Sequence, residues 1–371
     1  MKILVTGGAG FVGSHLVDAL LGAGHEVRVL DNLYEDVHGE SGKRPEHLNV
    51  GAELQVGDVR DPEAVRRALE GVEIVFHLAA IVGVGQSMYE IERYVSANSL
   101  GAAVLLEEIV ARRDRIRKML VASSMSIYGE GAYRNTRGEV VCPTLRSEAD
   151  LQARRFELED ADGCPLEAIP TFEDKPLQPT SIYAVTKRDH EEMFLSVGAA
   201  YGIPAVALRY FNIYGTRQAL SNPYTGVMAI FSARLLNRHR PMIFEDGLQT
   251  RDFVHVSDIV RANLLAMEAE AADGRLYNVG TGRPTTVLRI AELLAEQLGF
   301  HEPPDLVGRY RAGDIRHCYA DTSRIRDELG YHPEVDLADG IAELLAWLRS
   351  QTAVDRIDRA ARELEERGLA R

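Results

Sequence analysis

Residues 3–31 read ILVTGGAGFVGSHLVDALLGAGHEVRVLD, and their order predicts a buried strand, a tight turn, a helix and a second buried strand. The strands are the apolar runs 3–6 and 26–30, and the helix is the amphipathic run 14–21 between them. Two parallel strands joined by a helix form a βαβ unit. The stretch therefore predicts an α/β fold of the Rossmann type, with a doubly wound parallel sheet.

The turn before the helix carries glycines at the spacing of a dinucleotide site. Gly7 permits the tight turn, Gly10 lets the backbone approach a pyrophosphate, and Gly13 lets helix and strand pack closely. The free N–H groups at the start of the helix, at Phe11 and Val12, favour phosphate binding. A glycine-rich turn without a ligand is the alternative, but the residue types before and after the turn argue against it.

Asp31 ends the second strand, about 20 residues after the glycines, where dinucleotide-binding proteins place an acid. Its carboxylate would accept hydrogen bonds from the adenosine ribose and would repel a 2′-phosphate. The sequence therefore predicts NAD rather than NADP as the cofactor.

The length and charge of the chain limit what else it binds. With 371 residues it exceeds one ordinary domain, so two lobes are expected. The net charge of −14 argues against general binding of nucleic acid, although a few arginines could still hold an anionic small ligand. No apolar run reaches the roughly 20 residues of a membrane span, so no membrane contact is expected.

The N-terminus and the cysteines predict a cytoplasmic protein. Met1 and Lys2 lead directly into the first strand, which leaves no room for a signal peptide. Three cysteines (Cys142, Cys164 and Cys318) are too few for a disulfide scaffold and fit a reducing compartment.

Further apolar runs extend the predicted sheet at 53–56, 74–79, 119–123 and 205–209, with a helix at about 91–112. Strand ends in such a sheet point at one crevice, where ligands bind. We expect residues 1–211 to form the NAD-binding lobe. Residues 212–350 would form mainly a substrate lobe, with 256–267 and 276–279 returning to the first lobe. The charged tail 351–371 is assigned no chemistry.

Residues 130–179 form a polar stretch with five prolines, too long for an ordinary loop, which predicts an insertion with its own role. Cys142-Pro143 and Cys164-Pro165 resemble two halves of a zinc knuckle that each lack the second cysteine. A tetrahedral zinc site needs four ligands, so two ordinary loop cysteines and no metal are favoured over a zinc site.

The chemistry is indicated by three side chains. Tyr183 and Lys187 lie one turn apart on the same face of a predicted helix over 183–200. The pKa of tyrosine is about 10, and a nearby ammonium group or the positive ring of NAD⁺ would favour the phenolate. Ser124 ends a strand of the same sheet and could hydrogen-bond the same substrate hydroxyl.

Together these motifs resemble the extended short-chain dehydrogenases/reductases of the sugar-nucleotide epimerase/dehydratase group, from residue 1 to about 345. The matching stretches are 7–13, 57–60, 77–80, 123–129, 183–187, 208–215 and 249–256. The resemblance implies Ser124, Tyr183 and Lys187 as catalytic groups. It adds further residues to the predicted cofactor site, which comprises Gly7, Gly10, Phe11, Val12, Gly13, Asp31, Asn32, Asp58, Val59, Leu78, Ala79, Ala80, Asn98, Tyr183, Lys187 and Phe211.

The resemblance also implies a site for a nucleoside-diphosphate sugar. Asn212 would touch the sugar or the diphosphate, beside Ser124. Arg251 and Arg311 would clamp the diphosphate, because guanidinium groups match phosphate bidentately. Asp314 would bind the nucleotide ribose. A surface ion pair with Asp252 or Asp246 is the alternative role for Arg251.

The two residues that follow Ser124, Met125 and Ser126, indicate which reaction the site catalyses. Dehydratases of this group carry an acid pair there, and decarboxylases carry a glutamate at the second position. Met125 and Ser126 do not transfer protons near neutral pH, which favours 4-epimerisation through a transient 4-keto sugar. NAD would be regenerated in each cycle.

Within the group, the chain is most similar to dTDP-L-rhamnose 4-epimerases, on residues 124–129, the cysteine-proline insertion, 222–227 and 244–247. This predicts a dTDP-6-deoxyhexose such as dTDP-L-rhamnose as the substrate. UDP-glucose or UDP-glucuronate 4-epimerisation and dehydration remain open. A non-catalytic NAD(H)-binding redox sensor is a different class, and it would not need intact Ser124, Tyr183 and Lys187.

The resemblance also implies a homodimer. Helices 91–112 and 183–200 carry apolar residues on more than one side, as at Val104 and Met193. In this group such helices pair across a two-fold axis into a four-helix bundle. Packing against the chain's own sheet is the alternative.

Overall fold

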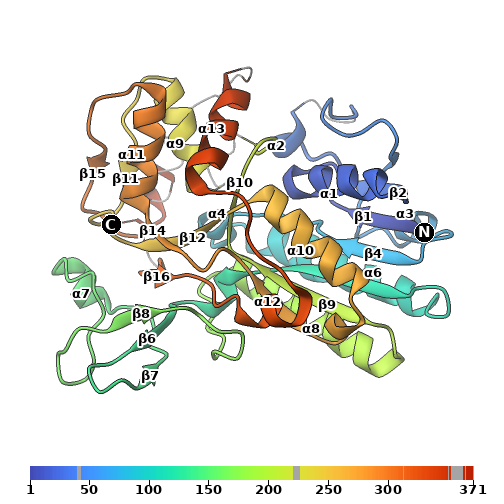
Figure 1. Cartoon of the computed structure of the whole chain (residues 1–371), viewed down its shortest axis with the longest axis horizontal. Coiled ribbons are helices and arrows are strands. Elements are labelled where there is room, and N and C mark those ends of the chain that lie inside the picture. The colour runs from blue at the N-terminus through green and yellow to red at the C-terminus, as the bar shows by residue number, and fades with distance from the viewer. Residues whose placement is uncertain are drawn as a thin grey trace.

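The computed structural model describes residues 1–39, 43–219, 226–311, 313–349, 351, 362–363 and 365–370. Its centre is a parallel sheet of seven strands in the order β13-β9-β5-β4-β1-β2-β3 (Figure 1). The strand order reverses between β1 and β4, which is the point where doubly wound sheets bind ligands. The strands are β1 (Lys2–Thr6), β2 (Glu26–Asp31), β3 (Glu53–Val56), β4 (Ile74–His77), β5 (Lys118–Ser124), β9 (Ala205–Tyr210) and β13 (Leu276–Val279).

Both faces of the sheet are covered, because side chains along each strand alternate between two apolar cores. Ile3 and Val5 of β1 belong to one core, and Leu4 belongs to the other. The first core is closed by α1 (Phe11–Gly22), α10 (Val256–Glu268) and α12 (Ser323–Leu329). The second is closed by α3 (Pro62–Ala68), α6 (Gly101–Val110) and α8 (Ile182–Tyr201).

The second lobe has its own core between three helices that lie side by side in Figure 1. They are α9 (Val227–Leu236), α11 (Val287–Leu298) and α13 (Leu337–Leu348). The core is backed by β10 (Asn212–Tyr214), β12 (Thr250–His255), β14 (Pro284–Thr286) and β16 (His317–Cys318), and β11 (Met242–Ile243) pairs with β15 (Asp305–Leu306). Two later segments lie on the first lobe: α10 packs against α1, and β13 pairs with β9.

The helix expected over 91–112 is not a single regular α-helix. It consists of α5 (Ile91–Tyr94), the π-helical segment η1 (Val95–Leu100) and α6, and it ends at Val110. The strand expected over 74–79 ends at His77. The remaining short helices are α2 (Glu35–His38), α4 (Val84–Ser87), η2 (Met125–Tyr128) and η3 (Glu270–Ala272).

Residues 130–179 form a small layer that is docked on the second lobe. β6 (Ala132–Arg134) pairs antiparallel with β7 (Val140–Val141) and β8 (Glu167–Ile169), and α7 (Glu148–Gln152) lies beyond them. The buried carboxylate of Glu130 accepts hydrogen bonds from the backbone N–H groups of Arg316 and His317 at 2.8–3.0 Å. Arg146 forms a buried ion pair with Glu245 at 2.8 Å. The insertion is therefore tied to the second lobe by buried charge.

Cys142 and Cys164 are free and partly buried, and the described residues contain no group of three or more His, Cys, Asp or Glu side chains that could hold a metal ion. Within the same residues, no helix is long and apolar enough to cross a membrane. Most of the tail 351–371 and residues 222–225 of the predicted substrate motif lie outside the described residues, as does Ala312.

Candidate active site

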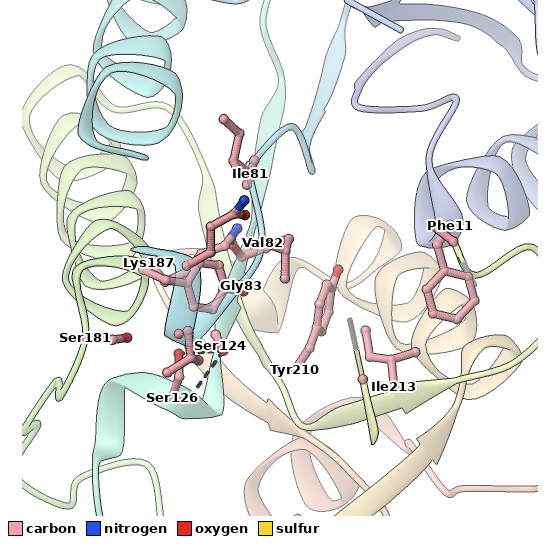
Figure 2. Close-up of a pocket in the computed structure, with 18 of the residues that line it drawn as sticks. Phe11, Ile81, Val82, Gly83, Ser124, Ser126, Ser181, Lys187, Tyr210 and Ile213 are labelled. Atoms are coloured by element: carbon pink, nitrogen blue, oxygen red, sulfur yellow. Dashed lines mark hydrogen bonds between the residues drawn. The ribbon is translucent and has the colours of Figure 1, made fainter. Parts of the chain in front are cut away.

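One cavity of about 790 Å³ opens at the carboxyl ends of the sheet strands and continues between the two lobes. Figure 2 shows its two sides: Ser124, Ser126 and Lys187 lie on one, and Phe11 and Ile213 on the other. The cavity is large enough to hold a dinucleotide cofactor and a second ligand in one continuous space.

The glycine turn after β1 is packed so closely that two of its glycines have no room for a side chain. Gly7 has φ +69°, and an added Cβ would lie 2.7 Å from the backbone nitrogen of Ala79. A Cβ on Gly13 would lie 2.3 Å from the carbonyl oxygen of Gly7. Gly10 lines the cavity, whereas Gly13 does not, so the role of Gly13 is to allow the close packing of helix on turn.

Asp31 lies at the end of β2 and lines the cavity, as predicted for a ribose-binding acid. Its carboxylate accepts hydrogen bonds at 3.0 Å from the backbone N–H groups of Ala9 and Leu33. These bonds hold the carboxylate beside the glycine turn. The pKa of the nearby Asp58 is lowered, chiefly by hydrogen bonds from Arg60, which pairs with it at 2.8 Å.

The loop after β4 forms the next part of the wall. Leu78, Ala79 and Ala80 line the cavity, as predicted. Asn98 does not line it, which differs from the prediction that this side chain contacts the cofactor. Instead, Asn98 is fully buried on η1, and its amide group bonds both the N–H and the carbonyl of Ile81 at 2.8 and 3.1 Å. Asn98 therefore positions the loop.

These features fit NAD. The closely packed glycines leave backbone open to a pyrophosphate, Asp31 stands where the adenosine ribose would bind, and apolar side chains from both lobes supply walls for the rings. Of the residues predicted to hold the cofactor, those that line the cavity are Gly7, Gly10, Phe11, Val12, Asp31, Asn32, Asp58, Val59, Leu78, Ala79, Ala80, Tyr183, Lys187 and Phe211.

Ser124, Tyr183 and Lys187 line the same cavity, although they come from β5 and α8. The ammonium group of Lys187 donates to the carbonyl oxygen of Ala122 at 3.0 Å. The hydroxyl oxygen of Ser124 lies 2.8 Å from that of Ser126 and also accepts from the Ser126 backbone N–H, which fixes its direction (Figure 2).

Burial has the largest effect on the pKa values of Tyr183 and Lys187. It raises the pKa of Tyr183 to about 12, and a hydrogen bond with Ser124 opposes the rise. It lowers the pKa of Lys187 to about 7. We expected the ammonium group of Lys187 to lower the pKa of Tyr183, but in this structure only Ser124 acts in that direction. A buried amine that is half neutral near pH 7 is a weak source of positive charge.

The predicted substrate residues also converge on the cavity. Arg251 forms an ion pair with Asp314 at 3.1 Å, and Arg311 pairs with the same carboxylate at 3.2 Å. Although burial of Asp314 acts to raise its pKa, the two guanidinium groups lower it overall. The buried amide oxygen of Asn212 has no hydrogen-bond partner in the described part of the chain.

The alternative partners considered for Arg251 are wrong. Asp252 is buried and accepts hydrogen bonds from Thr281 and Gly282 at 2.6–2.8 Å. Asp246 pairs with the buried Arg316. Arg251 therefore faces Asp314 and the cavity.

The sequence reasoning did not find several residues that line the cavity. They include Tyr210, Arg217, Gln218, Phe244, Gln249 and Leu369. Tyr210, Phe244 and Gln249 lie inside the matching stretches 208–215, 244–247 and 249–256. Arg217 and Gln218 follow the first of these stretches, so the motifs themselves were the available signal. Leu369 lies in the tail, and its position had no signal in the sequence.

Comparison with known proteins agrees with this geometry. Residues 3–147 and 161–280 match the NAD dependent epimerase/dehydratase family. The chain belongs to this family. It is therefore an enzyme that uses NAD, and the predictions of family, Rossmann-type fold and cofactor are confirmed.

Individual relatives match almost the whole chain. The chain is 36% identical to dTDP-L-rhamnose 4-epimerase of Burkholderia thailandensis, over 94% of this chain and 95% of that one. The crystal structure of a UDP-glucose 4-epimerase of Thermotoga maritima with UDP-glucose has a TM-score of 0.77 at 34% identity, covering 94% and 99% of the two chains. A Thermus thermophilus UDP-glucose 4-epimerase in complex with NAD has a TM-score of 0.74 at 31% identity, covering 95% and 100%.

We predict that Tyr183→Phe lowers turnover about 10²- to 10⁴-fold, the usual contribution of a general acid–base group. The variant removes only the phenol oxygen and keeps the ring in place, so it should retain NAD. Tyr277→Phe is a matched control, because Tyr277 is a buried tyrosine that does not line the cavity, and its hydroxyl donates to Glu328 at 2.7 Å. Steady-state kinetics and the NAD content of the purified variants test this. Retention of more than a tenth of the activity by Tyr183→Phe would contradict the assignment.

The buried amine of Lys187 also predicts a dependence of stability on pH. Its folded pKa of about 7 lies below its ordinary value of 10.5, so the unfolded chain binds this proton more tightly. The resulting cost to stability is largest below pH 7 and disappears as the pH rises towards 10.5. The prediction compares the free energies of unfolding of two NAD-free proteins, wild type and Lys187→Met. The wild-type value minus the Lys187→Met value should increase by about 2 kcal/mol from pH 7 to pH 9. Urea unfolding measures this difference, and a constant value would show that Lys187 keeps its proton.

Proposed function

We propose that this protein is a nucleotide-sugar 4-epimerase whose substrate is a dTDP-6-deoxyhexose such as dTDP-L-rhamnose. The observation that carries the proposal is the distribution of carboxylates around the cavity. Among the described lining residues, the acids are Asp31, Asp58 and Asp314. The first two lie at the cofactor end, and the third is held between two arginines.

No carboxylate therefore accompanies Ser124 among the described residues of the cavity wall. Met125 is buried, and the hydroxyl of Ser126 is bonded to Ser124. The insertion 130–179 could have supplied an acid, but none of its residues lines the cavity, and Glu130 is engaged with the backbone of Arg316 and His317. Elimination of water needs a group that removes the C5 proton, so the site favours epimerisation over dehydration.

The chain's own residues would then carry out proton transfer and orientation. Tyr183 would take the proton of the C4 hydroxyl, and Ser124 would hold that oxygen through its fixed hydroxyl. Lys187, bonded to Ala122, would hold the nicotinamide ribose and supply positive charge when protonated. Bound NAD⁺ supplies the acceptor for the C4 hydride. Asn212 and the two arginines would hold the diphosphate while the sugar turns over.

An apolar wall beside the triad supports a 6-deoxy sugar. Val82 and Gly83 of the loop after β4 and Val84 at the start of α4 line the cavity, and both valines are about half exposed. Figure 2 shows Val82 and Gly83 beside Lys187 and Ser124. A methyl group at C6 would bury favourably against such a wall, whereas a hydroxyl or carboxylate would lose hydrogen bonds. This favours a 6-deoxyhexose over glucose or glucuronate.

We propose that the enzyme is cytoplasmic and forms a homodimer through η1 and α8. All three cysteines are free, as in a reducing compartment. The hydroxyl of Ser99 on η1 donates to Asp189 on α8 at 2.5 Å, so the two elements form one surface. Val104 and Met193, named above, are partly buried against the core of their own chain, but Val95 and Leu100 remain 43% and 50% exposed. Exposed apolar side chains on this surface favour an isologous contact.

The dimer is tested by light scattering at micromolar concentration. Wild type should have twice the mass of the chain, and Leu100→Glu should shift it towards one chain, because the contact would bury two opposed carboxylates. Leu306→Glu, at a leucine with similar exposure on β15, should leave the mass unchanged. A monomeric wild type would contradict the proposal.

The reaction is tested by incubating the enzyme with a panel of dTDP- and UDP-sugars and reading the products by NMR and mass spectrometry. The account predicts a product of unchanged mass that differs only in configuration at C4, formed fastest from a dTDP-6-deoxyhexose. Free NADH should not accumulate. Loss of 18 mass units or of carbon dioxide would contradict epimerisation. A purified protein that retains NAD and turns over none of the panel would favour the redox-sensor alternative.

A further inference from the structure

Of the last described residues, 362–363 and 365–370, residues 365–368 are exposed, but Leu369 and Ala370 at the end are packed onto the protein. Figure 1 shows the C-terminus beside β11 of the second lobe. Ala370 is only 5% exposed and belongs to an apolar cluster with Phe244, Met242 and Val307. Ala370 also forms an antiparallel β-bridge with Arg311. The end of the chain is therefore packed against the residues that border the substrate end of the cavity.

The same segment contacts the first lobe. Tyr89, which follows α4, belongs to the cluster around Ala370. The guanidinium group of Arg367 lies 4.0 Å from the centre of the Tyr89 ring, within the range of a cation–π contact. On the second lobe, Glu365 forms an ion pair with Arg309. Residues 365–370 thus connect the two lobes across the mouth of the cavity.

Leu369 brings the C-terminal segment to the wall of the cavity. Its side chain is partly buried and lines the cavity, together with Phe244 and Arg311. The guanidinium group of Arg311 lies 4.7 Å from the centre of the Phe244 ring. Arg311 is one of the two proposed diphosphate ligands, so Phe244 and Leu369 border the space next to the diphosphate. The base of the nucleotide is the flat, apolar part of the substrate, and an aromatic ring and an aliphatic side chain are suitable walls for it.

We propose that Leu369 forms the outer wall of the site for the nucleotide base, and that residues 365–370 close this site by joining the two lobes over it. The proposal rests on the proposed function, because it takes the ligand to be a nucleoside-diphosphate sugar. It makes the C-terminus a determinant of substrate affinity. It places no part of the tail in the chemistry at C4.

The test uses the purified holoenzyme and measures binding of dTDP by calorimetry, with UDP in a parallel titration. Leu369→Ala removes apolar contact with the base and should weaken dTDP binding about five- to ten-fold. KM for the nucleotide sugar should rise by the same factor, with kcat within two-fold and NAD content unchanged. A chain that ends at residue 361 should weaken binding further. Leu306→Ala, at an exposed leucine outside the cavity, is the matched control and should bind dTDP as wild type does.

Each outcome decides the proposal. Wild-type affinity for dTDP in both Leu369→Ala and the shortened chain would overturn it. A fall in kcat with unchanged KM, or a loss of bound NAD in Leu369→Ala alone, would also overturn it, because either effect would show a general structural role. If wild type binds dTDP but epimerises no sugar, the proposed reaction fails while the binding comparison still tests Leu369. If wild type binds neither nucleotide, both proposals fail.

Discussion

The close contact between the turn after β1 and the loop after β4 is the constraint on which the active site depends. These two strands are neighbours at the point where the sheet order reverses. Gly7 brings the turn so near to Ala79 that a single Cβ would clash with its backbone. The same approach places Asp31 and the start of α1 along one wall of the cavity, and it directs the loop after β4 towards Ser124. Cofactor and substrate therefore meet where two backbone segments touch.

Buried polar groups hold the loop and the second lobe in place around this contact. Asn98 bonds the N–H and the carbonyl of Ile81, and these bonds hold the loop that carries apolar side chains into the cavity. Glu130 has a comparable role for the insertion, because its carboxylate receives the N–H groups of two successive residues of the second lobe. Burying this carboxylate without hydrogen-bond partners would cost free energy, so these bonds fix the position of the insertion on the second lobe.

The sequence predicts the parts of this site that depend on local patterns. The strands at 3–6, 26–30 and 205–209, the glycine turn and the Tyr183–Lys187 spacing are all set by neighbouring residues, and the structure reproduces them within one or two positions. Contacts between distant segments are different. The π-helical turn that buries Asn98, the docking of 130–179 and the approach of Leu369 to Phe244 depend on packing between residues up to 187 positions apart. The raised pKa of Tyr183 has the same origin, because it comes from burial by the whole fold.

The central claim is that hydrogen leaves C4 and returns to it within one active site, in a cavity with no described carboxylate beside Ser124. Running the reaction in D₂O and locating deuterium in the product by NMR tests this most directly. The account predicts a C4 epimer that carries no deuterium at C4 or C5, because the C4 hydrogen does not exchange with water and no group removes the C5 proton. Deuterium at C5 would show a base that the described residues do not contain, and deuterium at C4 would show that the original hydrogen is not returned.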